Sequence, residues 1–293
     1  MTKVLELKNI SKKYKDYSAL NKVSFSLDEG EIIGLVGPNG SGKTTLMRII
    51  VGLTKNFEGE VLLEDGTAIG CVIETPSFYP FMTGYENLKY FASINDVSIE
   101  KVMETTELLG LKDALNKKVK DYSLGMKQRL GILAALLRDP KLLILDEPTN
   151  GLDPTGIHEL REYIKGIARK KKITVLISSH ILSELEKICD KAVIIKHGEI
   201  VDVLKIDDFK NSSEVILTIG IENVIDASKI FKDNNIAIFK SDKDSISISV
   251  NKEESNGIVN FLNNNNIKFN SLYEQKRTLE DKFLDLMEEN NIK

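Results

Sequence analysis

Short apolar runs alternate with helical patterns through the front part of the chain. The runs at residues 31–37, 141–147 and 173–180 are dominated by aliphatic side chains, and the segments between them carry apolar residues at helical spacing. Continuous apolar runs of this length are typical of parallel strands that are covered on both faces, because strands with one exposed face alternate instead. The pattern predicts an α/β domain for this part of the chain.

The pattern changes from residue 213 onward. Apolar and polar residues alternate at 215–219 and 246–250, and a short strand is expected at 267–269. Apolar residues at 224–231 and 258–262 repeat at helical spacing instead. The order strand, helix, strand, strand, helix, strand is that of a ferredoxin-like α+β unit.

Loop-forming residues are concentrated before this change. All six prolines precede residue 155, and only Gly220 and Gly257 of the nineteen glycines lie beyond residue 200. With 293 residues, of which 42% are hydrophobic, the chain can bury one large core and a smaller one. We therefore expect a first domain over residues 1–210 and an accessory α+β domain over residues 211–293.

Composition and charge exclude several classes of protein. The formal net charge is -4, so a nucleic-acid partner is not indicated. Cys71 and Cys189 form no CxxC pair, which argues against a disulfide framework and against a zinc site. The N-terminal residues lack the apolar core of a secretory signal, and no apolar stretch approaches the roughly 18 residues of a membrane helix. We expect a globular protein with no membrane span of its own.

The segment GPNGSGKTT at residues 37–45 carries the strongest chemical signal. It follows an apolar strand and precedes a helical pattern, the context in which Gly-x-x-x-x-Gly-Lys-Thr forms a phosphate-binding loop. Glycines allow backbone N–H groups to point at phosphate, and the helix adds its positive end. We expect Lys43 to reach the β- and γ-phosphates of a nucleotide and Thr44 to bind Mg²⁺. The expected binding residues are Gly37, Pro38, Asn39, Gly40, Ser41, Gly42, Lys43, Thr44 and Thr45.

Two further strands end in residues suited to phosphate chemistry. The run at 141–147 ends in Asp146, a natural ligand for Mg²⁺, and Glu147, which can act as general base toward an attacking water. Placing two carboxylates directly after a buried apolar strand costs free energy unless they have such partners. The run at 173–180 ends in His180, which is placed to hold the γ-phosphate or the water.

With YSLGMKQR at residues 122–129, just upstream of the acidic strand, about the first 210 residues resemble the ATP-binding subunit of an ABC transporter. The resemblance implies a P-loop NTPase fold of ABC type that binds and hydrolyses ATP with Mg²⁺. The family's Leu-Ser-Gly-Gly-Gln pentapeptide appears as Tyr122–Met126, which retains Ser123 and Gly125. In the family these residues grip the γ-phosphate of a nucleotide on the opposing subunit. The resemblance therefore implies a homodimer with two ATP molecules at its interface.

Other roles follow from the resemblance alone. It implies that Tyr14 stacks on adenine; Tyr17 lies close to it, and the alternative for either ring is that of a packed aromatic. It also implies that Asp153 communicates across the dimer interface and that His180 is the switch histidine. A separate transmembrane permease subunit is implied as partner, and it would hold the chain at the cytoplasmic face of the membrane.

Glu74 occupies a strand end where ABC proteins usually carry Gln. A glutamate keeps an oxygen ligand for Mg²⁺ but loses the amide donor, and it adds a negative charge beside Asp146 and Glu147. We expect only the metal, Lys43 or protonation to offset that charge. Two interpretations stay open: Glu74 is a near-neutral replacement that still coordinates through oxygen, or it tunes catalysis.

A narrower resemblance rests on Glu74, the segment SFYPFMTGYENL at 77–88 and the altered pentapeptide. This combination is similar to exporters of bacitracin resistance and lantibiotic immunity, which implies export of an antimicrobial peptide or a similar amphipathic compound. In the family, the loop with Phe78, Tyr79 and Phe81 receives a helix of the membrane subunit, so an exposed patch there would be an interface. The alternatives are a nonhydrolytic regulatory ABC protein, against which Glu147 argues, and an exporter of an unrelated drug or lipid.

Overall fold

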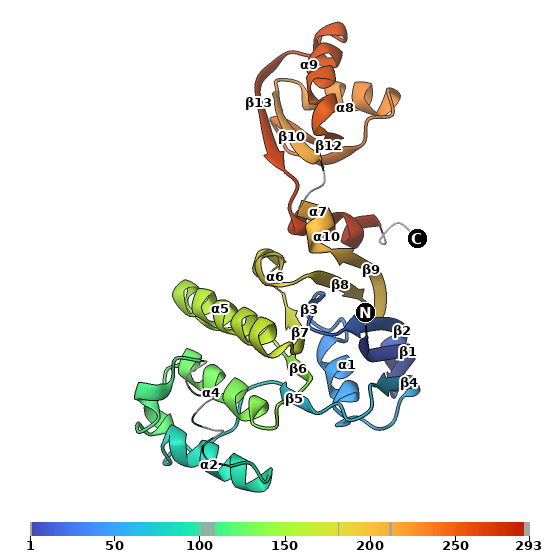
Figure 1. Cartoon of the computed structure of the whole chain (residues 1–293). Helices are drawn as coiled ribbons and strands as arrows, with labels where there is room; N and C mark the ends of the chain where they lie inside the picture. Colours follow the sequence, from blue (N-terminus) through green and yellow to red (C-terminus); the bar gives the residue numbers. More distant parts are fainter. Residues whose placement is uncertain are drawn as a thin grey trace. The chain divides into compact units, whose positions relative to one another are not determined.

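The chain forms two compact units, Met1–Ile206 and Asp207–Lys293, each with its own sheets and helices (Figure 1). The computed structural model describes residues 2–98, 100, 103, 106, 109–180, 182–210 and 213–289. The division between the units falls close to the boundary expected at residue 210. Among the described residues, no helix combines the length and the apolar composition that crossing a membrane requires.

A six-stranded sheet lies at the centre of the first unit. Its strand order is β5-β6-β7-β3-β8-β9, and the neighbours are parallel except for the antiparallel β8 and β9. The strands are β3 (Ile32–Val36), β5 (Ile69–Val72), β6 (Leu142–Leu145), β7 (Thr174–Ser179), β8 (Lys191–Lys196) and β9 (Glu199–Lys205). Every residue of β3, β6 and β7 is buried. The three apolar runs are therefore confirmed as interior strands of an α/β fold.

The parallel register brings distant parts of the chain to one edge of this sheet. Val36 pairs with Ser179, and Val72 pairs with Leu145. Because parallel strands end at the same edge, the segments that follow them meet there, as ligand sites of α/β sheets usually do. The edge collects the phosphate loop after β3, Asp146 after β6 and His180 after β7.

An antiparallel sheet, which the sequence did not predict, completes the first unit. Its order is β2-β1-β4, and its strands are β1 (Lys3–Tyr14), β2 (Tyr17–Asp28) and β4 (Glu58–Leu63). Leu5 and Leu7 of β1 share a buried cluster with Leu46 and Met47 of helix α1 (Lys43–Ile50) and with residues of the central sheet. Helix α1, which begins directly after the phosphate loop, is therefore held by the cores of both sheets.

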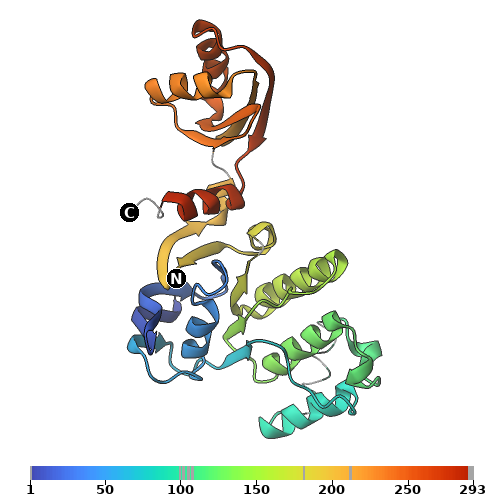
Figure 2. The same ribbon diagram turned by 180° about the vertical axis from the view of Figure 1, so that it is seen from behind.

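Among the described residues of the first unit, three further helices begin at polar caps: α2 (Gly84–Ile94), α4 (Leu124–Leu136) and α5 (Pro154–Lys171). Helix α6 (Leu182–Ile188) follows β7. Thr83 caps α2 in a reciprocal capping box with Glu86, Ser123 caps α4, and Asp153 caps α5. Helices α2 and α4 contact each other and lie side by side in both ribbon views (Figure 2).

The second unit has the predicted ferredoxin-like order. Its elements are β10 (Glu214–Ile221), α8 (Val224–Asp233), β11 (Ile238–Ser241), β12 (Ser245–Asn251), α9 (Ser255–Asn264) and β13 (Phe269–Lys276). The antiparallel sheet has the order β11-β12-β10-β13, and one face of it packs on both helices. The rings of Phe231 and Phe261 meet edge to face with centroids 5.4 Å apart. Helices α7 (Ile206–Lys210) and α10 (Leu279–Glu289) flank these elements along the chain.

Candidate active site

Close packing requires glycine at two positions of the loop between β3 and α1. A Cβ atom at Gly37 would lie 2.2 Å from the Ile195 carbonyl oxygen. At Gly42, where φ is 105°, it would lie 2.6 Å from the Ala19 carbonyl oxygen. Backbone oxygens cannot move aside as a flexible side chain can, so any larger residue would distort the loop. The shape of the loop is thus set by the sheets on either side of it.

Lys43 lies inside this loop. Its Nζ donates to the Gly37 carbonyl oxygen at 2.7 Å and to the Pro38 carbonyl oxygen at 3.3 Å, and it lies 3.8 Å from Glu147 Oε1. Ser41 Oγ is also buried and has no hydrogen-bond partner among the described residues. A buried hydroxyl without a partner, beside a buried ammonium group, is typical of a site that receives an anion.

Asp146 is held by hydroxyl groups from two elements. Thr44 Oγ1 donates to Asp146 Oδ2 at 2.7 Å, and Ser178 Oγ donates to Oδ1 at 2.6 Å. Within the described ranges, no group of three or more His, Cys, Asp or Glu residues could enclose a metal ion. Thr44 and Asp146 nevertheless fit Mg²⁺, because this ion usually takes one or two hard oxygen ligands from the protein and completes its shell with phosphate and water.

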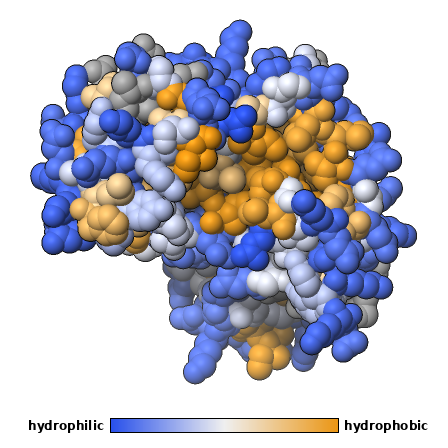
Figure 3. All heavy atoms as spheres, turned by 90° about the horizontal axis from the view of Figure 1, so that it is seen from below, coloured by the Kyte–Doolittle hydropathy of each residue, from blue (hydrophilic) through white to orange (hydrophobic). Residues whose placement is uncertain are grey.

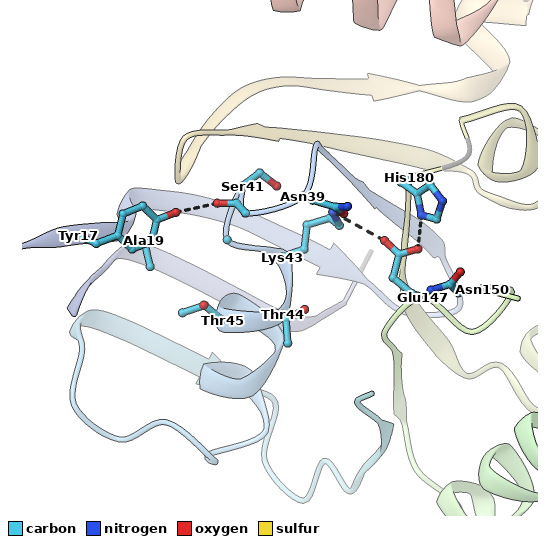
Figure 4. A pocket seen from close by; sticks show the side chains of 12 residues that line it. Tyr17, Ala19, Asn39, Ser41, Lys43, Thr44, Thr45, Glu147, Asn150 and His180 are labelled. Atoms are coloured by element: carbon cyan, nitrogen blue, oxygen red, sulfur yellow. Dashed lines mark hydrogen bonds and ion pairs between the residues drawn. The ribbon is translucent and has the colours of Figure 1, made fainter. Parts of the chain in front are cut away.

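Glu147 joins Lys43 and His180. Its backbone adopts the left-handed region with φ of 48°, and its N–H donates to Ser178 Oγ at 2.8 Å. Glu147 Oε2 lies 2.7 Å from His180 Nδ1, while Oε1 faces Lys43 Nζ (Figure 4). A carboxylate held through both oxygens is oriented toward the space in front of the phosphate loop. Such a placement suits a general base.

Lys43, Thr44, Glu147 and His180 line one cavity of about 300 Å³, whereas Asp146, Gly37 and Pro38 are not part of its lining. Its lining consists of residues 39–45 together with Tyr17, Ala19, Glu147, Asn150 and His180. Most of the residues expected to bind nucleotide are thus brought together, and Asn150 is an addition that the sequence did not suggest. Convergent polar groups in the mouth of such a cavity are typical of a ligand site.

The aromatic residue at this cavity is Tyr17 and not Tyr14. The Tyr17 hydroxyl donates to the Gly40 carbonyl oxygen at 2.8 Å, which ties its ring to the phosphate loop. Tyr14 is absent from the lining, and Lys12 Nζ lies 4.7 Å from the centroid of its ring. The two residues pair at the end of the β1–β2 hairpin, so only the turn between them decides which ring faces the loop.

Glu74 forms an ion pair that the sequence did not suggest. Its Oε1 accepts a hydrogen bond from Arg48 Nη2, and its side chain is 63% exposed. Glu74 is absent from the lining of the phosphate cavity. The expectation that only the metal, Lys43 or protonation offsets its charge is therefore wrong, because Arg48 does so.

Ser123, Gly125 and Asp153 line a second cavity, of about 400 Å³. It lies where α4 and α5 begin, and it shares no lining residue with the first cavity among the described residues. Arg129 Nε donates to the Gly125 carbonyl oxygen at 3.4 Å, and its Nη1 lies 3.5 Å from Glu159 Oε2. Two helix N-termini and the Arg129 guanidinium group favour an anion here, while the carboxylates of Asp153 and Glu159 also line the cavity.

Aromatic residues of α2 and of the loop that precedes it form a cluster. Ring contacts link Phe78, Tyr79, Phe81, Tyr90 and Phe91, with centroids 5.3 to 5.9 Å apart. The hydrogen bond to Tyr90 raises the pKa of the Tyr79 phenol. Beside them a groove of about 350 Å³ is lined by residues of β5, the loop after it, α2 and α4. Seen from below, the molecule carries a broad hydrophobic area (Figure 3).

Asn87 fixes the loop that bears these rings. It is fully buried, its Oδ1 accepts from Tyr79 N at 2.9 Å, and its Nδ2 donates to the carbonyl oxygens of Tyr79 and Thr83. The amide thus pairs with both backbone groups of Tyr79, as a neighbouring strand would. Sequence reasoning missed this residue, because an Asn within a helical pattern gives no signal of its own.

Comparisons with known proteins agree with this site. Residues 20–150 match the family described as ABC transporter. An uncharacterized ABC transporter ATP-binding protein of Bacillus subtilis, YhcH, is 39% identical over 98% of this chain and 96% of its own length. The bacitracin transport ATP-binding protein BcrA of Enterococcus faecalis is 39% identical over 79% of each chain. The lantibiotic transport ATP-binding protein SrtF of Streptococcus pyogenes is 40% identical over 72% of this chain and 95% of its own.

Solved structures show the same fold for the first unit. A nucleotide-free ATP-binding cassette from an ABC transporter has a TM-score of 0.64 and 28% identity, covering 70% of this chain and 92% of the other. The dimeric structure of a bacterial ABC transporter cassette has a TM-score of 0.62 and 27% identity, covering 69% and 98%. The P-loop NTPase fold of ABC type is therefore confirmed, as is the resemblance to the bacitracin and lantibiotic group.

Proposed function

Since this chain belongs to the ATP-binding proteins of the ABC transporter family, we propose that it powers export of an antimicrobial peptide, or a similar amphipathic compound, through a separate membrane subunit. Cassettes of this family hydrolyse ATP to drive transport. The choice of cargo is supported by the relatives named for bacitracin and lantibiotic transport, which are 39% and 40% identical to this chain.

The observation that carries the ATPase assignment is the convergence of Lys43, Glu147 and His180 on one cavity. The backbone N–H groups of the loop and Lys43 bind the phosphates of ATP. Thr44 and Asp146 would hold Mg²⁺, which would supply positive charge to neutralise the charge that develops on the phosphates. These residues supply positioning and electrostatic stabilisation, which is most of what phosphoryl transfer requires.

Glu147 moves the proton. Its Oε2 is held by His180 Nδ1, so Oε1 takes the proton of the attacking water. Lys43 Nζ, which faces Oε1 at 3.8 Å, turns toward the phosphates when ATP is bound. His180 keeps the carboxylate oriented and contacts the γ-phosphate from the other side of the cavity.

Two copies of the chain close over the nucleotide. The serine-capped start of α4 lines a cavity that is separate from the phosphate loop of its own chain. In a homodimer, Ser123 and Gly125 of one copy would meet the γ-phosphate bound by the other copy, and Asp153 would lie at the same interface. The support for this arrangement is the pair of separate anion-suited cavities, together with the dimeric cassette of the same fold.

The groove beside the aromatic residues receives the membrane subunit. It is lined mainly by apolar and small side chains from β5, α2 and α4. An exposed apolar groove of this kind is suited to an amphipathic helix. Docking there would hold the chain at the cytoplasmic face of the membrane.

The proposal is tested by expressing the chain with its copurifying membrane protein in a peptide-sensitive host. Tolerance of bacitracin and of a lantibiotic should rise with the unmodified chain and with Lys55→Ala, an exposed control, but not with Lys43→Ala. Purified protein should hydrolyse ATP in parallel, except for Lys43→Ala. Active ATPase without protection against any tested peptide would refute the cargo and leave the ATPase assignment standing.

A further inference from the structure

A salt bridge joins the phosphate-binding helix to the strand end at Glu74. Helix α1 begins at Lys43, so its first turn carries the residues that bind phosphate and metal. Arg48 lies in its last turn and donates from Nη2 to Glu74 Oε1. The pair connects the last turn of α1 to the segment that follows β5.

Glu74 lies close to Asp146 in the topology of the sheet. Strands β5 and β6 are parallel neighbours, and Asp146 N donates to the Val72 carbonyl oxygen at 2.9 Å. Glu74 follows two residues later in a left-handed conformation with φ of 65°, which is unfavourable for a residue other than glycine. Its carboxylate is nevertheless bound by Arg48 and absent from the lining of the phosphate cavity.

The segment that follows Glu74 leads into the aromatic loop. The groove beside the aromatic residues is lined by four residues of this segment, Thr75, Pro76, Ser77 and Phe78. The next residue, Tyr79, is held by Asn87. Because Glu74 directly precedes this loop, a contact that fixes the Glu74 side chain also restrains the first residues of the loop. Arg48 is in a position to connect it to α1.

The pair is weak enough to open when a better partner for either group is present. The Arg48 side chain is 41% exposed and the Glu74 side chain 63% exposed. Exposed pairs typically contribute only about 0.2–1 kcal/mol, because solvent screens the charges and both side chains lose rotamer freedom. A bound Mg²⁺ or a change at the groove could shift such an equilibrium with a modest difference in affinity.

We propose that Arg48 is a positioning residue for Glu74. Its hydrogen bond to Glu74 holds the carboxylate outside the phosphate cavity and ties residues 73–79 to helix α1. Without Arg48, the free carboxylate of Glu74 adds a negative charge at the edge where the phosphates bind. This inference rests on the proposed function, because it gives both residues a part in ATP turnover.

The test is a cycle of four proteins: the unmodified chain, Arg48→Gln, Glu74→Gln and the double variant. Without nucleotide, either single variant should speed amide hydrogen exchange in residues 73–79 by up to about fivefold, the most that an exposed pair can contribute. The double variant should add nothing further. Arg48→Lys, which keeps the charge, should preserve most of the protection, and Arg169→Gln in the last turn of α5 serves as a matched control.

The same proteins should differ in their apparent KM for ATP. Arg48→Gln should raise KM by about three- to fivefold with kcat less affected, whereas in the Glu74→Gln background it should change KM by less than about twofold. Equal effects in both backgrounds, or unchanged exchange in residues 73–79, would overturn the proposal. Failure of the chain to protect cells from peptides would refute the export function and leave the exchange result intact.

Discussion

Replacing Glu147 with Gln should nearly abolish ATP turnover without weakening ATP binding. Gln keeps the shape of the side chain and can still bond with His180, but it cannot take a proton from water. Loss of a general base typically slows a reaction by about 10²–10⁴-fold, a barrier increase of about 3–5 kcal/mol. The variant should therefore bind ATP, pair with a second copy and remain in that state.

Glu147→Gln also removes a negative charge, and this loss should make ATP binding tighter while it slows turnover. Lys43 Nζ lies 3.8 Å from Glu147 Oε1, with side chains 7% and 22% exposed. At an effective dielectric constant of about 20, such a pair attracts by about 4 kcal/mol before desolvation and screening are subtracted. Gln removes this competitor for Lys43, so we expect ATP to bind up to about tenfold more tightly, a net gain of about 1.4 kcal/mol.

Phosphate release at saturating MgATP and titration with a fluorescent nucleotide measure the two effects separately. Glu162→Gln, an exposed glutamate on α5, is the matched control and should behave like the unmodified chain. Turnover within about tenfold of the unmodified chain would remove Glu147 from the general-base role. Weaker nucleotide binding would show that its carboxylate does not compete for Lys43.

Three further outcomes follow from the geometry. Tyr17→Ala should weaken ATP binding by about 1–2 kcal/mol through loss of base stacking, and Tyr14→Ala should have little effect. Equal losses of affinity in a nucleotide titration would contradict the placement of Tyr17 at the cavity. A maleimide should label the exposed Cys71 and spare the buried Cys189. Although Cys71 is exposed, partial desolvation of its sulfur by neighbouring groups raises the pKa of the thiol above its ordinary 9.0. Labelling, followed by mass spectrometry, should therefore still accelerate beyond pH 9.0, and a docked membrane subunit should block it. Asn87→Leu should lower the free energy of unfolding by about 2–4 kcal/mol in chemical denaturation, because it leaves both backbone groups of Tyr79 unpaired; a loss below about 1 kcal/mol would mean that water replaces the amide.

The interior of the fold could be predicted because its sequence pattern is unambiguous. Strands β3, β6 and β7 are buried on both faces, so every residue in them is apolar or small. The β2-β1-β4 sheet could not be predicted in the same way. Register shifts at several points along the β1–β2 pair break the alternation that marks a half-buried strand. Strand β10 is regular along its pairing with β12, and its alternation was recognised.

The candidate site divides along similar lines. Residues within the loop 37–45 and at the strand ends Asp146, Glu147 and His180 follow from local motifs and parallel topology. Contacts between side chains of different helices and strands cannot be predicted from local motifs in this way. The sequence does not indicate Arg48 as the partner of Glu74, because Arg48 belongs to no motif and the two residues meet only in the folded chain. Of the two tyrosines, only Tyr17 lines the phosphate cavity, and the sequence does not specify the β1–β2 turn that places it there.

Gly125→Asp should separate nucleotide binding from dimer formation. A Cβ atom at Gly125 would lie 3.6 Å from Leu152 Cδ2, which is ordinary van der Waals contact, so the fold accepts a side chain there. The residue lines the second cavity and not the phosphate cavity of its own chain. An aspartate at this position would place a negative charge against the γ-phosphate of the opposing copy. ATP affinity of the single chain should therefore be unchanged.

Sedimentation in the Glu147→Gln background measures the pairing directly. With ATP, that protein should sediment as a dimer, and adding Gly125→Asp should return it to the monomer. Gly166→Asp adds the same charge on α5, where an added Cβ would meet no atom within 4 Å outside its chain neighbours and its own helix backbone, and it should leave the dimer intact. If Gly125→Asp weakened ATP binding by the isolated chain instead, the glycine would serve the nucleotide of its own copy, and the two cavities would belong to one site. Separate cavities in one chain predict the opposite, because only a second copy can bring the start of α4 to the phosphate loop.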